Sequence, residues 1–118
     1  MGETEERRAA LRNLVMLAEP VDVALRSLAR YRWGDTVSVQ VEASHVVHLL
    51  EAFVEGRISS DEVERWAFAL VGRDDVEYDQ RWPAEIAQFM FEAENPEIEG
   101  TLSVDRASEW IRKLRPLA

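Results

Sequence analysis

The sequence predicts a single all-α domain of five or six helices over residues 1–118, with at most one short strand or hairpin near residues 31–42. Three observations predict this fold. Apolar residues recur every three or four positions over most of the chain, which is the spacing of one helix face. Capping and stop signals separate these stretches. A chain of 118 residues, 47% of them hydrophobic, is long enough for one core, and it holds no repeat or linker that would divide it.

Two helices are predicted at the start of the chain, over residues 4–18 and 20–34. Thr4 is placed to cap the first helix, and acidic residues follow it in the first turn, where the helix dipole favours negative charge. Pro20 suits the first turn of the second helix, and Gly34 offers a stop. Each helix carries an apolar stripe that we expect to face the core.

The segment 36–42 breaks the helical pattern. Val37, Val39 and Val41 alternate with polar residues, which indicates a short strand. A lone strand needs a partner. We expect it to pair either within a hairpin with residues 31–33 or with a second copy of the chain across a dimer axis.

Two capped helices are predicted next. Ser44 is placed to cap the third helix, and Gly56 is placed to end it in a left-handed conformation. Ser59 and Glu62 have the spacing of a capping box, in which each side chain accepts a hydrogen bond from the other residue's backbone. Gly72 closes this fourth helix.

The last third of the chain predicts two helices and two loops. Residues 73–81 are polar and acidic and indicate a loop. Pro83 opens the fifth helix, which Asn95 ends because it precedes a proline. A second loop is expected over 96–101, and Ser103 is placed to cap the sixth helix. We expect this helix to turn one face inward, made of Val104, Ala107, Ile111 and Leu114.

Acidity is concentrated in one part of the chain. The formal net charge is −9, but residues 42–99 alone carry fifteen acidic and four basic side chains. Such a field repels nucleic acids and anionic lipid surfaces and attracts a basic protein or a cation. The absence of cysteine excludes disulfides and thiolate chemistry. Because we find neither a long apolar run nor a secretory signal, we expect a cytoplasmic protein that contacts no membrane.

Four tryptophans raise the question of stacking on nucleic acid bases. Stacking platforms also need basic neighbours that follow the phosphate backbone, and this chain is neutral to acidic around them. We therefore expect most tryptophans, and Trp66 in particular, to anchor helices to one another in the core.

His45, His48 and Glu51 are the only weak candidates for metal ligands. They share one side of the third predicted helix, but they lack the spacing of helical zinc hydrolases, so a solvated surface is the favoured interpretation. The acidic loop after Gly72 does not complete a calcium-binding loop, because the glycine and the final glutamate of that motif are missing. No nucleophile-elbow, phosphate-loop or dinucleotide-binding motif is present, so we expect neither catalytic residues nor a cofactor.

An interaction surface is predicted around two phenylalanines. Phe68 and Phe91 point away from the apolar stripes of their helices, which indicates either helices buried on two sides or an apolar patch for a partner. Glu64 and Glu94 lie one turn or less from these rings and would give the patch an acidic rim. The acidic loop would add four further carboxylates, Asp74, Asp75, Glu77 and Asp79.

A resemblance covers residues 49–114. The residues that carry it are Gly56-Arg57-Ile58-Ser59, Glu62-Val63-Glu64-Arg65-Trp66-Ala67, Gly72-Arg73-Asp74-Asp75-Val76, Asn95-Pro96-Glu97 and Leu102. In these the chain resembles a group of short bacterial helical proteins without an assigned activity, and the resemblance implies no catalytic residue. In size, acidity and helical layout the chain is also similar to colicin-type immunity proteins, which neutralise a basic nuclease toxin.

These observations predict a non-enzymatic interaction module that binds a basic protein partner, in the manner of an immunity or inhibitor protein. Two alternatives stay open. One is a metal-binding protein or metal-dependent hydrolase that uses His45, His48 and Glu51. The other is a self-associating structural protein that forms a homodimer through residues 37–41.

Overall fold

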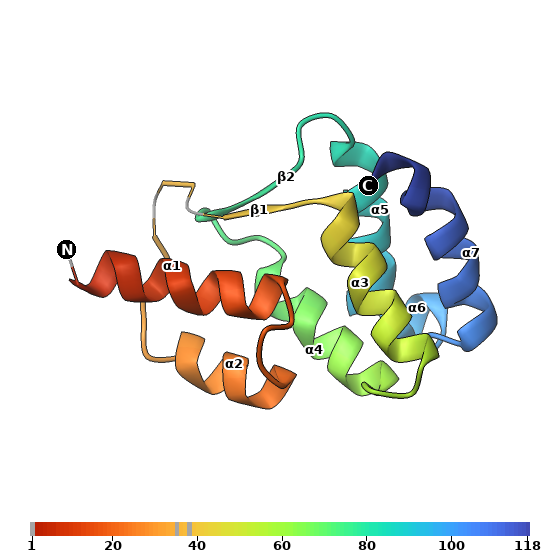
Figure 1. Ribbon diagram of the computed structural model, residues 1–118, viewed down its shortest axis with the longest axis horizontal. Helices are drawn as coiled ribbons and strands as arrows, with labels where there is room; N and C mark the ends of the chain where they lie inside the picture. Colours follow the sequence, from red (N-terminus) through yellow and green to blue (C-terminus); the bar gives the residue numbers. More distant parts are fainter. Residues whose placement is uncertain (1, 35, 38) are drawn as a thin grey trace.

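The helices form two groups, which the helix α4 and a short sheet connect (Figure 1). The computed structural model describes residues 2–34, 36–37 and 39–118. Its elements are α1 (Gly2–Val15), α2 (Val21–Leu28), β1 (Val39–Val41), α3 (Ala43–Val54), α4 (Ser60–Leu70), β2 (Val76–Tyr78), α5 (Pro83–Glu94), α6 (Pro96–Glu99), α7 (Val104–Leu114) and a final 3-10 turn, Arg115–Leu117. The chain is a compact, mainly helical globule, as predicted. Its described residues form seven α-helices and a two-stranded parallel sheet, whereas the sequence predicted five or six helices and at most one strand or hairpin.

The first two helices both end earlier than predicted. α1 also begins earlier, at Gly2, so Thr4 lies within the helix and is not its N-cap. α1 ends at Val15 because Leu17 turns the chain with a positive φ of 54°, so the helix does not reach residue 18. α2 ends at Leu28, six residues before the predicted stop at Gly34. The segment between α2 and β1 has no regular structure where it is described. The predicted loop over 96–101 contains the four-residue helix α6.

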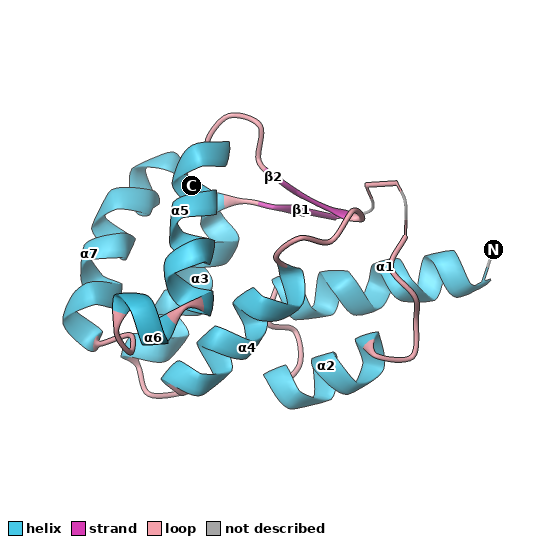
Figure 2. Cartoon of the chain, turned by 180° about the vertical axis from the view of Figure 1, so that it is seen from behind, coloured by secondary structure: helices cyan, strands magenta, loops and turns pink. Residues whose placement is uncertain are grey.

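The sheet differs from both predicted pairings. β1 pairs in parallel with β2, with Val39 opposite Val76 and Val41 opposite Tyr78. The hairpin with residues 31–33 is therefore wrong, and so is the loop predicted for all of 73–81. Parallel strands need a long crossover connection, and α3 and α4 supply it (Figure 2).

The pairing of β1 with β2 removes the reason for predicting a homodimer through residues 37–41. β1 has its partner within the chain, so it needs no second copy to satisfy its backbone on that edge. Val39 and Val41 are buried, and Val37 is exposed outside the strand. The argument that led to a dimer axis at this segment therefore no longer applies.

One continuous core joins the elements, and tryptophans anchor it. Trp66 is fully buried on α4, and its indole N–H donates to the Leu14 carbonyl of α1 at 2.8 Å. Trp110 of α7 meets Phe89 of α5 edge to face, with ring centroids 5.6 Å apart. The predicted anchoring role of Trp66 is confirmed. Val104, predicted to face inward, is exposed, because the buried stripe of α7 starts one turn later, at Ala107.

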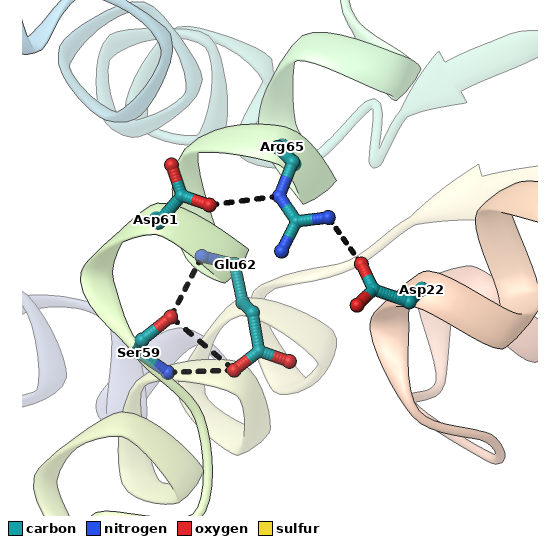
Figure 3. Close-up of polar contacts among 5 residues, drawn as sticks. All are labelled: Asp22, Ser59, Asp61, Glu62 and Arg65. Atoms are coloured by element: carbon teal, nitrogen blue, oxygen red, sulfur yellow. Dashed lines mark hydrogen bonds and ion pairs between the residues drawn. The ribbon is translucent and has the colours of Figure 1, made fainter.

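Helix caps explain why most boundaries could be predicted. Ser59 accepts from the Glu62 backbone at 3.1 Å, and Glu62 accepts from the Ser59 backbone at 3.0 Å, so the capping box of α4 is confirmed (Figure 3). Ser103 caps α7 as predicted. Ser44 does not cap α3, since Glu42 is its N-cap and the Glu42 backbone donates to His45 Nδ1 at 2.9 Å.

Membrane insertion of a helix is not indicated by this part of the chain. Over the residues that the structure describes, no helix has both the length and the apolar character that crossing a bilayer would need.

Candidate interaction surface

Phe68 projects from α4 beside α2, with 72% of its surface exposed. The apolar strip around it is called here the α2–α4 seam. Its residues are Leu25, Leu28, Ala29, Tyr31, Trp33, Phe68 and Ala69. Phe68 lines two shallow depressions, one of about 380 Å³ that also borders Glu64 and Arg65, and one of about 340 Å³ that also borders Trp33 and Arg73. Both are lined by Leu25, Phe68 and Ala69.

The first depression has a negative rim. Arg65 pairs with Asp61 one turn earlier, at 3.0 Å, and with Asp22 of α2 across the seam (Figure 3). Two carboxylates thus share one guanidinium, which leaves this cluster with an excess negative charge. Glu64 adds a further carboxylate, which makes no ion pair with any described residue. A group that docks here therefore meets an anionic rim at the Glu64 end.

The second depression lies against a buried ionic cluster. The Trp33 ring, 58% exposed, lies 5.2 Å from the Arg73 guanidinium carbon, which is a cation–π geometry. Arg73 Nε and Nη2 donate to Asp75 at 2.8 and 2.9 Å. The Gly34 backbone donates to the same carboxylate at 3.0 Å, and Arg7 Nε lies 3.3 Å from it. Arg73 is therefore already paired and offers little free positive charge to a ligand.

Asp75 does not belong to an interaction surface, contrary to the prediction. Its side chain is fully buried. Burial alone would raise the pKa of its carboxyl, but hydrogen bonds from Arg73 and the Gly34 backbone reverse this effect and lower the pKa below its usual value. Asp75 therefore stays ionised as a structural partner of Arg7 and Arg73.

Asp79 is also removed from the predicted surface. Its carboxylate is buried and accepts from Arg81 Nη2 at 2.8 Å, Arg81 Nε at 3.1 Å and the Arg81 backbone at 3.0 Å. These hydrogen bonds lower its pKa. Asp79 is buried because it directly follows β2, which packs against the core, so only part of the predicted loop faces solvent.

The remaining predicted residues do not gather at Phe68. Asp74 is exposed and Glu77 half-buried, but neither lines the seam. Phe91 is 51% exposed on α5, and it lines neither of the two depressions beside Phe68. Glu94 lies near Tyr78, whose pKa is raised by burial and by this carboxylate. Phe68 and Glu64 therefore line one depression together, and Phe91 and Glu94 are not among its lining residues.

An acidic groove of about 490 Å³ lies between α4, α5, α6 and α7. The charged side chains that line it are Asp61, Glu64, Glu92, Glu99 and Arg106. Arg106 binds Glu92 in bidentate fashion at 2.6 and 2.7 Å, and the Trp110 indole N–H donates to Glu92 at 3.0 Å. Glu64 lines both this groove and the first depression of the seam, so the two hollows adjoin. Sequence reasoning missed the groove, because no local pattern links Arg106 to Glu92.

The metal candidates are separated by their contacts. His45 Nδ1 is used as an acceptor in the cap of α3, and burial lowers its pKa, so the imidazole is held neutral. Glu51 pairs with Arg115 Nη2 at 2.5 Å, and His48 is exposed. Within the described residues, no three His, Asp or Glu side chains are grouped closely enough to hold a metal ion.

No family model matches the chain, and no curated protein or solved structure matches it either. The resemblance to short bacterial helical proteins stays a prediction. The structure gives many of its residues a role in the fold: Ser59 caps α4, Trp66 fills the core, and Arg73 binds the buried Asp75. These three residues of the pattern therefore serve the fold of this chain and do not form a site.

Proposed function

We propose that this protein is a non-enzymatic interaction module that binds a basic protein partner at the α2–α4 seam and the carboxylates beside it. The observation that carries the proposal is the position of Phe68, a largely exposed aromatic ring with the anionic side chain of Glu64 one turn away. Exposed aromatic residues are frequent binding hot spots, and a charged rim selects the partner.

The charge distribution supports a basic partner. Ion pairs within the chain neutralise Asp75, Asp79 and Glu92. Residues 42–99 still carry fifteen acidic against four basic side chains, a count that already includes Arg73 and Arg81. Such a field speeds the approach of a cationic protein and repels a second copy of the same chain. Among interaction modules we favour an inhibitor of the immunity type, because the chain is similar to such proteins in size, acidity and helical layout.

The test is affinity capture with matched variants. The immobilised wild-type chain, Phe68→Ser and Phe91→Ser are exposed to a native lysate of the encoding organism at about 0.05 and 0.5 M salt, and retained proteins are identified by mass spectrometry. We expect a basic protein on the wild type and on Phe91→Ser at low salt, and its loss at high salt or with Phe68→Ser. The proposal is contradicted if no basic protein is retained, or if equal amounts of it are retained at low and at high salt.

The inhibitor form has its own measurement. The captured partner is purified and assayed for nuclease or other activity with and without an equimolar amount of the chain. Inhibition that Phe68→Ser weakens supports the immunity-like role, and an unchanged activity in the complex excludes it.

A further inference from the structure

We infer that the α2–α4 seam receives an amphipathic α-helix of the basic partner, with two apolar side chains on either side of Phe68 and a lysine or arginine against Glu64. This inference rests on the proposed function and specifies the partner's binding segment. Its basis is the pair of depressions that share one exposed ring along the line where two helices pack.

The shape of the seam calls for two anchors. Phe68, Leu25 and Ala69 line both depressions, and from these shared residues one depression extends to Glu64 and the other to Trp33. A ligand that lies along the seam must therefore place apolar groups before and after the ring. On a helix, residues three or four positions apart point to the same side one turn from each other, so one helix face supplies both groups and leaves room for Phe68 between them.

Backbone chemistry favours a helix over an extended segment. An extended peptide gains affinity by pairing with the free edge of a strand. The seam is built from α2, α4 and the chain after α2, and mid-helix backbone groups already bond within their own helices. An extended peptide would leave its own N–H and C=O groups without protein partners here, whereas a helix satisfies them internally.

Electrostatics give the ligand a direction. At the Glu64 end, Asp22 and Asp61 share Arg65, and Glu64 itself is unpaired among the described residues. At the Trp33 end, Arg73 is bound to Asp75 and stacked on the indole ring. We therefore expect the cationic residues of the ligand beside the apolar side chain that fills the depression at Glu64. A second copy of this chain, with its acidic excess, fits this rim poorly.

The experiment uses a display library of random peptides about 16 residues long, enough for four helical turns. After selection on the wild-type chain, enriched peptides are synthesised, and their Kd is measured with wild type, Phe68→Ser, Glu64→Lys and Phe91→Ser. Phe91→Ser is the matched control, because it also removes an exposed helical phenylalanine but lies outside the seam. Thermal melts confirm that each variant is folded.

The expected peptides repeat apolar residues at intervals of three and four, carry lysine or arginine, and gain helical circular dichroism on binding. Their Kd rises about tenfold or more with Phe68→Ser, rises about threefold to tenfold with Glu64→Lys, and is unchanged with Phe91→Ser. Peptides without helical periodicity, or with equal affinity for Phe68→Ser, overturn the inference.

Failure of the inference and failure of the proposed function give different results. Basic peptides that lose affinity with Glu99→Lys in the acidic groove, and not with Phe68→Ser, overturn the helix inference and keep the basic partner. Enriched peptides that are not basic overturn both. Analytical sedimentation tests whether a second copy of the chain occupies the seam. If the wild type forms a dimer and Phe68→Ser is a monomer, the seam binds a second copy and the inference is overturned.

Discussion

Asp75 shows how one side chain ties distant segments together. It is a fully buried carboxylate that accepts from Arg73 and the Gly34 backbone and lies beside Arg7 of α1. Arg7 itself crosses directly over Gly34, where an added Cβ would lie 2.3 Å from the guanidinium. A glycine at this position therefore leaves room for a buried arginine, and it does not end a helix as the sequence predicts.

Replacing Asp75 by asparagine should destabilise the fold strongly. Asp75→Asn keeps the size of the side chain but leaves two arginines without their carboxylate in a buried setting, which costs about 3 kcal/mol or more in the free energy of unfolding. Urea unfolding followed by circular dichroism measures the change. Asp74→Asn, one residue earlier and exposed, is the control and should stay within about 0.5 kcal/mol of the wild type. Equal effects of both variants would show that the buried cluster contributes little.

At the scale of elements, helix boundaries were predicted correctly where they depend on residues a few positions apart in the sequence. The capping box of α4, the cap of α7 and the glycines with positive φ after α3 and α4 are all visible in the sequence, because a cap involves residues three positions apart. β2 gives no such signal. Its three residues, Val76–Tyr78, form a strand only because β1 lies beside them after a crossover of two helices.

The cap of α4 predicts a moderate and local loss of stability. Ser59→Ala removes the side chain that accepts from the Glu62 backbone and breaks half of the capping box, so we expect the free energy of unfolding to fall by about 1 kcal/mol. Ser60→Ala, in the first turn of the same helix, should change it by less than about 0.5 kcal/mol. Urea denaturation compares the two, and a larger loss for Ser60→Ala would contradict the assigned cap.

For the whole molecule, acid should reduce stability in two stages. His45, Asp75 and Glu92 all have a lower pKa in the folded chain than their ordinary values of 6.5, 3.8 and 4.5. When the pH falls below the ordinary pKa of one of these groups, the unfolded chain binds more protons than the folded chain. Falling pH therefore favours unfolding. His45 acts first, below pH 6.5, and the two carboxylates act below about pH 4.5.

Urea midpoints measured between roughly pH 8 and pH 2.5, a range that covers both stages, test this prediction. The variant His45→Gln, whose amide oxygen can still accept from the Glu42 backbone, should lose the first stage and keep the second. A midpoint that rises between pH 7 and pH 5.5 would contradict the sign given for His45.

The candidate site was predictable in part. Helical periodicity places Phe68 off the buried stripe of α4 and puts Glu64 one turn away, and both lie together in the structure. A count of charges treats all carboxylates alike, so it could not show that Asp75 and Asp79 are bound by arginines inside the fold. Trp33 belongs to a segment without regular structure, so its place in the seam depends on tertiary contacts with Arg73.

The parallel sheet also imposes an order on synthesis. At about 5 to 20 residues per second, a ribosome delivers β2 roughly 2 to 7 seconds after β1. Because the exit tunnel delays both strands by the same length of chain, β2 also emerges from it this long after β1. β1 is therefore outside the ribosome for seconds before its partner strand emerges, with both of its edges unpaired and open to wrong pairing.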